Sequence, residues 1–212
     1  MDLVLFGIQG SGKGTLGKFL AQEYGLEVFE TGSELRKLSS ENSALGQKVK
    51  SIVEAGHLVP NEVVMDIIEN FMAHLPAGKN VLFDGIPRKM EQAQTFEALM
   101  KKLGRDFMGL FLEISEELAM KRLTTRRICK VCKTVYPAVY TKTTCEKCGG
   151  ELGTRSDDNP ESIKTRLKAY FDETLPVIEH YKKEQKMITI NGEQSIEEVN
   201  QAANQVLEKI LA

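Results

Sequence analysis

Short apolar runs alternate with longer segments of helical periodicity along the chain. The apolar runs have the length of buried strands and occupy residues 3–8, 27–30, 81–84, 109–113 and 187–191. Between them, apolar side chains recur every three or four residues, as they do in amphipathic helices. Strands that alternate with helices form parallel sheets covered on both faces, so the pattern predicts a three-layer α/β fold with a five-stranded parallel sheet.

Three positions have the pattern of a helix start. They are two capping boxes and one N-cap followed by proline, at Thr31/Glu34, Ser195/Glu198 and Asn159/Pro160. We expect helices to begin at all three.

Two segments interrupt the alternation and predict appendages on one main domain. Residues 30–59 are helical but lie between the second and third strands, and residues 126–154 contain all four cysteines and a Thr/Lys-rich stretch. The main domain would then comprise residues 1–29, 60–125 and 155–212. A chain of 212 residues has room for one core with small insertions rather than for two full domains. We expect both insertions to close as hinged bodies, with Asp157 and Asp158 near one hinge.

Composition and charge narrow the function classes. Hydrophobic residues make up 42% and charged residues 27%, which is typical of a soluble globular protein. A formal net charge of −2 excludes an overall basic field that would attract nucleic acid or an anionic membrane. The amino-terminal residues have no basic start before a long apolar segment, and no run has the length of a membrane span. We therefore expect a cytoplasmic protein without nucleic-acid or membrane partners.

Residues 7–15, GIQGSGKGT, directly follow the first predicted strand and precede a helical pattern. This is the strand, loop and helix context of a P-loop. Glycines let the backbone wrap round a phosphate chain, whose oxygens meet consecutive N–H groups and the positive end of the helix. Lys13 adds a mobile positive charge. The loop therefore predicts a nucleotide phosphate site at Gly10, Ser11, Gly12, Lys13, Gly14 and Thr15.

These glycines also allow two other interpretations. The generic motif has Ser or Thr directly after the lysine, whereas Gly14 stands before Thr15 here. The glycines could serve only tight strand-to-helix packing, but the lysine would then have no role. Residues 12–17 also fit the GxGxxG dinucleotide fingerprint, with Glu30 at the end of the next strand. That match begins several residues beyond the strand, where the tight turn should already be finished.

The variant GxxGxGKGT resembles the phosphate loop of the adenylate kinase family, and the resemblance extends over essentially the whole chain. The family's monophosphate-binding segments resemble residues 31–36 (TGSELR) and 56–62 (GHLVPNE). The family signature is similar to residues 83–93 (FDGIPRKMEQA), and the segment leaving the lid is similar to residues 154–167 (TRSDDNPESIKTRL). The resemblance implies a monomer that catalyses reversible, Mg²⁺-dependent phosphoryl transfer from ATP to AMP, giving two ADP.

The resemblance also implies the binding residues. For AMP they are Thr31, Arg36, His57, Leu58, Val59, Gly85, Ile86, Pro87, Arg88, Gln92, Arg155 and Arg166. For ATP, beyond the phosphate loop, they are Arg122, Arg126, Val135, Tyr136 and Gln194. Catalysis is implied for Lys13, Arg88, Arg126, Arg155 and Arg166. Asp84 ends a strand and is expected to organise Mg²⁺ through water. Arg105 and Arg127 are expected to be arginines on helix surfaces, paired with neighbouring acids.

These residue types suit phosphoryl transfer. The acceptor is already an anionic oxygen, so catalysis requires positioning and charge stabilisation rather than a protein nucleophile. Arginine offers paired donors in a planar fork and does not deprotonate. Such a positive cluster in a nearly neutral protein would repel itself unless it binds a polyanion.

The cysteines form two CxxC pairs separated by 12 residues: Cys129, Cys132, Cys145 and Cys148. This spacing suits one tetrahedral zinc ion, and four thiolates leave no open coordination position, so the ion would be structural. A short insertion builds little apolar core, and metal binding would supply the missing folding energy. A redox pair, two disulfides and free structural cysteines are the alternatives. The three histidines have no ligand spacing.

Other functions also fit part of the sequence. The same chemistry on UMP, CMP or a deoxynucleotide is the nearest alternative. A zinc ribbon that binds nucleic acid is another, although the near-neutral charge and the lack of an aromatic-rich basic face argue against it. The chain departs from the family at Gln9, often proline there, at Ile86, usually phenylalanine, and at Pro137 after Tyr136 in the lid.

Overall fold

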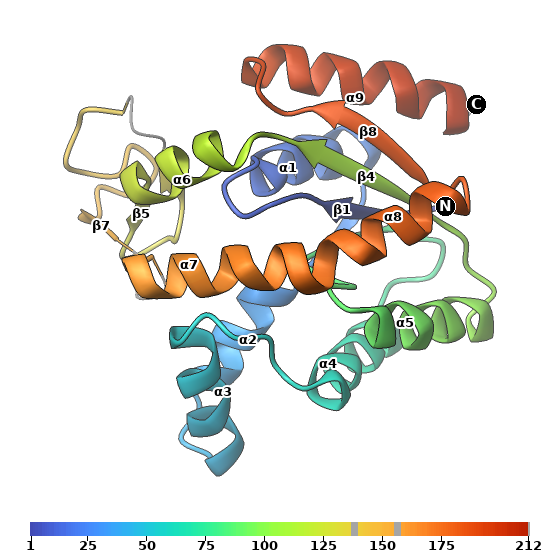
Figure 1. Ribbon diagram of the computed structural model, residues 1–212, viewed down its shortest axis with the longest axis horizontal. Helices are drawn as coiled ribbons and strands as arrows, with labels where there is room; N and C mark the ends of the chain where they lie inside the picture. The colour runs from blue at the N-terminus through green and yellow to red at the C-terminus, as the bar shows by residue number, and fades with distance from the viewer. Residues whose placement is uncertain (137–139, 155–157, 212) are drawn as a thin grey trace.

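The computed structural model describes residues 1–136, 140–154 and 158–211 (Figure 1). At its centre is a five-stranded sheet in the order β2-β3-β1-β4-β8, in which all four strand pairs are parallel. The strands are β1 (Asp2–Phe6), β2 (Glu27–Glu30), β3 (Val81–Asp84), β4 (Phe107–Glu113) and β8 (Met187–Asn191). The predicted fold class is therefore confirmed. β1 ends at Phe6, two residues earlier than expected, because the glycine-rich loop begins there.

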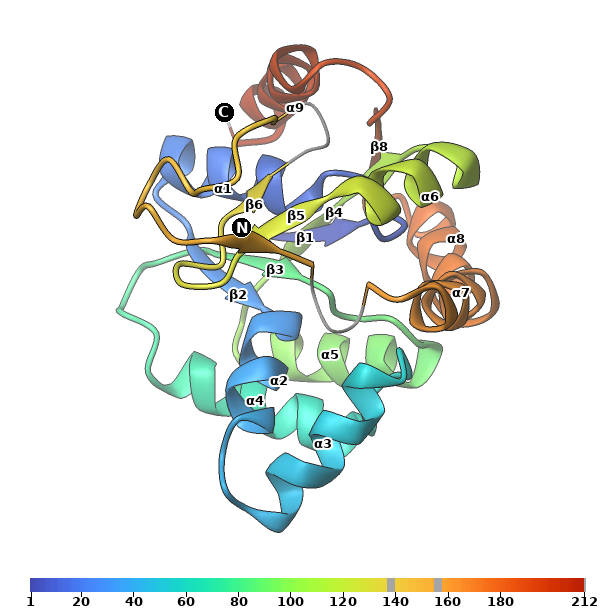
Figure 2. The same ribbon diagram turned by 90° about the vertical axis from the view of Figure 1, so that its left-hand side faces the viewer.

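Helices cover both faces of this sheet (Figures 1 and 2). One face carries α1 (Lys13–Tyr24) and α9 (Ile196–Leu211), whose apolar side chains pack on Leu3 and Leu5. The other carries α4 (Asn61–Ala73), α5 (Met90–Lys102) and α8 (Leu175–Lys183), which pack on Val4 and Phe6. Alternate residues of β1 therefore serve opposite cores, as expected for a strand buried on both faces.

A wide helical turn leads into α8 from the helix before it. α7 (Pro160–Ala169) continues into the π-helical turn η1 (Tyr170–Thr174) and then into α8. The hydroxyl of Thr174 is buried and donates to the carbonyl oxygen of Arg88 at 3.1 Å. α6 (Glu116–Thr125) follows β4. No pattern in the sequence predicted the π-helical turn.

Two smaller units extend from the central layers. α2 (Thr31–Ser39) and α3 (Ala44–Glu54) project together from the carboxyl end of β2 (Figure 1). The second unit is an antiparallel sheet in the order β6-β5-β7, which faces the viewer in Figure 2. Its strands are β5 (Arg127–Cys129), β6 (Val135–Tyr136) and β7 (Leu152–Gly153). The domain boundaries stay a prediction.

Two of the three expected helix starts are confirmed. Ser195 and Glu198 exchange the reciprocal bonds of a capping box, at 3.0 and 3.3 Å. Asn159 Oδ1 accepts from the backbone N–H of Ser162 at 2.9 Å. The expected cap at Thr31 is wrong, because β2 runs directly into α2: Glu30 is the N-cap and Thr31 is already helical. Among the described residues, the buried Thr31 Oγ1 has no hydrogen-bond partner.

Candidate active site

The glycine-rich loop is enclosed between β4 and α6. Gly7, Gly10 and Gly12 have φ angles of +148°, +87° and +105°, which residues with a side chain rarely adopt. A Cβ atom at Gly7 would lie 2.6 Å from the carbonyl oxygen of Leu112, and one at Gly10 would lie 3.0 Å from that of Ala119. Only glycine fits this path, which brings the loop N–H groups to the start of α1.

Lys13 is the first residue of α1, and its ammonium group turns back into the loop. It donates to the carbonyl oxygens of Gly7 at 2.7 Å and Ile8 at 3.1 Å. Desolvation of the ammonium lowers the pKa of Lys13 to about 8. The carboxylate of Asp84 opposes this shift, and three nearby arginines increase it: Arg88, Arg126 and Arg166. Three of the arginines expected from sequence therefore lie close enough to Lys13 to affect its pKa.

Arg122 joins this loop to the turn that follows β8. Its Nη1 donates to the carbonyl oxygens of Ser11 and Gly192, both at 3.2 Å, and Nη2 also donates to Gly192. The guanidinium therefore holds the two segments together. The implied contact with the ATP base stays a prediction.

Asp158 holds two of the arginines. The Nε and Nη2 atoms of Arg126 each donate to one of its carboxylate oxygens at 2.5 Å, and Arg166 Nη1 donates to Oδ1 at 3.1 Å. The Asp158 side chain is only 2% exposed. Sequence reasoning placed Asp158 near a hinge and missed this role. Arg155 and Asp157 lie outside the described residues, as does Pro137.

Arg88 is fixed through its main chain and its side chain. Its N–H donates to Gln92 Oε1 at 2.9 Å, and its Nε donates to the carbonyl oxygen of Gly85 at 2.9 Å. Gly85 has a φ of +90°, and a Cβ there would lie 2.8 Å from Arg88 Nη2 and 3.4 Å from Thr31 Cβ. The glycine thus lets Arg88 and Thr31 approach each other beside the buried Gln92.

Ile86 and Pro87 directly follow Gly85. The Ile86 side chain is buried in the main core, so only its main chain could reach a ligand. The Ile86–Pro87 peptide bond is cis.

The segment after α3 packs against α7. Gly56 has a φ of +80°, and a Cβ there would lie 2.7 Å from the carbonyl oxygen of Ser162 and 3.1 Å from Arg166 Cγ. The hydroxyl of Ser162 donates to the carbonyl oxygen of Glu54 at 2.7 Å. Of the next three residues, His57 is exposed, Leu58 is half-buried and Val59 is buried in the main core. Their implied contacts with AMP stay a prediction.

Carboxylates lie at the carboxyl ends of β2 and β3. Glu30 pairs with Asp84 in the register of these strands. Glu30 Oε1 accepts from Arg36 Nη2 at 3.0 Å. The predicted role of Asp84 in organising Mg²⁺ remains a prediction.

Three of the residues implied for ATP lie in the lid or in the turn after β8. Tyr136 is buried in a small lid core, where its hydroxyl lies 3.1 Å from Cys145 Sγ. The side chains of Val135 and Gln194 are exposed. Contacts of these residues with ATP stay a prediction.

The four cysteine sulfurs form one cluster. All four Sγ atoms lie within 4.8 Å of one another, with Cys129 to Cys148 at 3.5 Å and Cys132 to Cys145 at 3.4 Å. A disulfide requires about 2.05 Å, so the disulfide interpretation does not hold in this structure. Sulfurs around a tetrahedral zinc, each about 2.3 Å from the ion, lie roughly 3.8 Å apart, and the observed cluster is compatible with that arrangement.

The two arginines expected to have surface roles differ. Arg105 forms a two-point ion pair with Asp2 at 2.6 and 2.7 Å, and the same carboxylate accepts from the N–H of Val81. The expected acidic partner is therefore present, but Asp2 is buried and Arg105 is 22% exposed, so the pair ties the loop before β4 to β1 and β3. Arg127 lies over the ring of Tyr140, 5.9 Å from its centroid, and not on a helix as expected, because β5 begins there.

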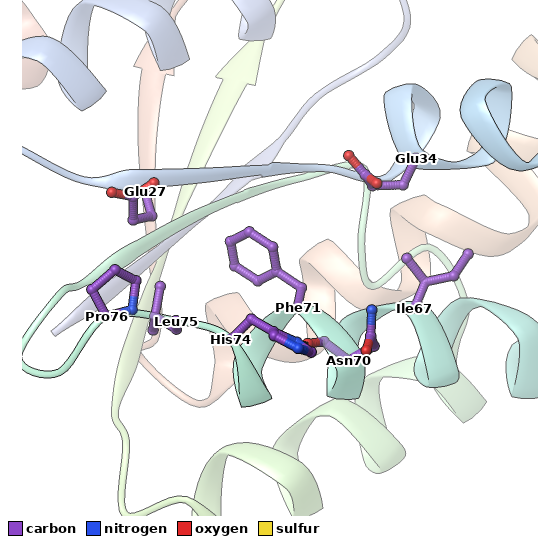
Figure 3. A pocket seen from close by; sticks show the side chains of 8 residues that line it. All are labelled: Glu27, Glu34, Ile67, Asn70, Phe71, His74, Leu75 and Pro76. Carbon is purple, nitrogen blue, oxygen red and sulfur yellow. The ribbon is translucent and has the colours of Figure 1, made fainter.

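One cavity of about 300 Å³ lies apart from these residues, between β2, α2 and α4 (Figure 3). Its lining is Glu27, Glu34, Ile67, Asn70, Phe71, His74, Leu75 and Pro76. None of the site residues predicted from sequence is among these described residues. The candidate site is therefore defined by the loop and the arginines and not by this cavity.

Together, the loop closed round its own lysine, the parallel sheet and the converging arginines define a P-loop nucleotide-binding phosphotransferase. A family model described as "Adenylate kinase" matches residues 5–186. The adenylate kinase of Thermosipho melanesiensis is 37% identical over 206 residues, covering 94% of this chain and 95% of the relative. The adenylate kinases of Methanocella arvoryzae and Bacillus subtilis are each 36% identical, covering 99% and 94% of this chain and 100% and 94% of the relatives.

The chain therefore belongs to the adenylate kinase family. In the part of the chain that the structure describes, no helix has both the length and the apolar character needed to cross a membrane.

Proposed function

We propose that Lys13 and the arginines around it perform the reaction of this chain, which is the reversible transfer of a phosphoryl group from ATP to AMP to give two ADP. The ATP phosphates would lie on residues 10–15, and the AMP phosphate between Arg36 and Arg88. Arg126 and Arg166 would contact the transferring group, together with Arg155. The observation that supports this assignment is the convergence of three arginines on Lys13, which helps lower its pKa to about 8.

The charges account for the chemistry. Cations held close together in a partly desolvated site repel one another, and bound phosphates remove that repulsion. Charge spread over the transferring oxygens in the transition state would be stabilised by donors that are already in place. Arg88 fits this role well, because its N–H, its carbonyl oxygen and its Nε all have partners within the protein.

Recognition of the acceptor base would rest on Thr31 and Gln92. Both side chains are buried, and Gln92 uses its oxygen on Arg88. The carboxamide nitrogen of Gln92 would then donate to a ring nitrogen of adenine. Thr31 Oγ1 has no partner within the described chain, so it could bond the same base.

Two metal ions are proposed. Mg²⁺ bound with ATP would neutralise phosphate oxygens, and Asp84 would orient its water ligands from the end of β3. Zn²⁺ would be structural, held by the four cysteines. The small core beside them consists of Cys129, Tyr136 and Cys145, with Tyr140 and Leu152 against it. Because this apolar core is so small, the unit would need the free energy of metal binding to stay folded.

The remaining features are also proposals. We propose that residues 30–59 and 126–154 close over the substrates, which would exclude water from the transferring phosphoryl group. We further propose that the chain acts as a monomer in the cytoplasm. The reducing conditions of that compartment agree with the open thiol geometry of the four cysteines.

A coupled assay over a panel of monophosphates tests these assignments. ADP should form with ATP and AMP, and UMP and CMP should be poorer acceptors. Arg88→Ala should lower kcat by about 10³ to 10⁵, the range for an arginine that stabilises transition-state charge. Arg127→Ala is the matched control, because this arginine lies over Tyr140 in the lid sheet. A near-normal rate for Arg88→Ala would remove it from the catalytic group, and equal rates with UMP would refute the base assignment.

A further inference from the structure

Glu30 stands at the junction of β2 and α2. It ends the strand and is the N-cap of the helix, but its carboxylate does not cap the helix in the described structure. Instead, Oε1 accepts a hydrogen bond from Arg36 Nη2 at 3.0 Å. The Glu30 side chain therefore forms an ion pair with Arg36, at the edge of the sheet where the substrate phosphates are expected.

The guanidinium of Arg36 lies across the first turn of α2. A Cβ atom at Gly32 would lie 3.1 Å from its Nη1 and 3.8 Å from its Cζ, so glycine leaves the space that the group occupies. The first N–H groups of a helix have no intrahelical acceptor, and the positive end of the helix dipole favours anions. Arg36 and this helix end together suit a phosphate, and the carboxylate of Glu30 already accepts a hydrogen bond from Nη2 of Arg36.

We propose that Glu30 is an internal competitor for Arg36 that lowers the affinity of the acceptor site for the phosphate of AMP. This inference rests on the proposed role of Arg36 as a ligand of that phosphate. When the phosphate binds, the carboxylate either releases Nη2 or stays beside a second negative group. Both outcomes weaken binding, and neither involves Glu30 in the transfer of the phosphoryl group. Glu30 is in this sense a residue that sets affinity.

The expected effect is modest because water screens the pair. The side chains of Arg36 and Glu30 are 39% and 44% exposed. Exposed charge pairs contribute little, and partial screening of a dianionic phosphate points to a change of about 3- to 10-fold in Kd. Glu30→Gln is the most informative substitution, because it keeps the shape and an acceptor oxygen and removes only the charge.

The test is a calorimetric titration of wild type, Glu30→Gln and Glu34→Gln with AMP and with adenosine, at low and high salt. Glu34 is the matched control, because it lies on the same helix and pairs with Lys37 at 2.6 Å. For Glu30→Gln we expect the Kd for AMP to fall about 3- to 10-fold at low salt, and the gain to shrink at high salt. Adenosine has no phosphate, so its Kd should not change. Glu34→Gln should match wild type with both ligands.

Three outcomes overturn the inference. A Kd for AMP that is unchanged or raised in Glu30→Gln would show that the carboxylate does not compete and instead holds Arg36 in place. An equal gain for adenosine would show that the effect does not act through the phosphate. In a parallel titration, Arg36→Gln should weaken AMP binding; if it does not, the proposed role of Arg36 and the inference fail together. If only Glu30→Gln lacks its effect, the inference alone fails.

Discussion

Asp158→Asn should destabilise the nucleotide-free protein and slow the reaction. The Asp158 side chain is 2% exposed and accepts from Arg126 and Arg166, whose side chains are 15% and 13% exposed. Asparagine occupies the same space but carries no charge, so two poorly hydrated guanidinium groups beside Lys13 would lose the negative charge of Asp158. Removing one partner of a buried ion pair costs about 3–5 kcal/mol. We expect the lower end, about 3 kcal/mol, because the asparagine oxygen can still accept one bond.

The change can be measured by denaturant unfolding and by turnover at saturating ATP and AMP. Asp172→Asn is the matched control: Asp172 pairs with Lys168, but that pair is exposed, so its loss should cost less than about 1 kcal/mol. The decrease in the free energy of unfolding caused by Asp158→Asn should be smaller in saturating ADP, because bound phosphates replace the missing negative charge. Turnover should fall about 100-fold, since two of the proposed catalytic arginines lose their orientation. A free energy of unfolding within 1 kcal/mol of wild type without nucleotide would refute this reasoning.

Three further predictions follow from the site. Burial lowers the pKa of Lys13 from 10.5 to about 8, so the unfolded chain binds more protons than the folded chain between these two pH values. The contribution of Lys13 to the free energy of unfolding therefore rises with pH in this range. Lys13→Met should raise the Tm of the nucleotide-free protein below pH 8, and this gain should vanish toward pH 10.5. A gain that does not vary with pH would contradict the assignment. Thr174→Val should lower kcat about 10-fold by releasing the carbonyl oxygen of Arg88, and Thr174→Ser should retain activity; equal rates for both variants would argue against positioning through this bond. Protein purified without chelator should contain one zinc per chain by elemental analysis, and chelation or Cys129→Ser should lower the Tm; a metal-free cluster in fully active protein would disprove the structural role.

Local patterns were sufficient for the elements and for the phosphate loop. Short apolar segments predicted each strand of the main sheet, and the glycine and lysine spacing after β1 predicted the loop. Both features can be read from residues that are neighbours in the chain. A strand buried on both faces is recognised by its apolar side chains, and a loop with positive φ angles is recognised by its glycines. The cysteine spacing succeeded for the same reason, because each CxxC pair is a local knuckle.

Pairings between distant segments were missed. Asp158 looked like a hinge residue, yet it holds arginines 32 and 8 residues away. The contact of the Tyr136 hydroxyl with Cys145 also had no sequence signal. Both contacts depend on which segment the fold brings opposite, and sequence spacing does not contain that information. The expected cap at Thr31 is a separate, local error, because β2 leaves no loop residue before α2.

The sequence by itself determined the layered α/β architecture, the phosphate loop, the clustered cysteines and the family. Only the tertiary structure decided how the cations are held before substrate arrives: Lys13 by loop carbonyls, Arg126 and Arg166 by Asp158, and Arg36 by Glu30. The physical reason is that elements and loops follow from short-range periodicity and backbone freedom. A charge, by contrast, takes its partner from whatever acceptor the fold brings within about 3 Å.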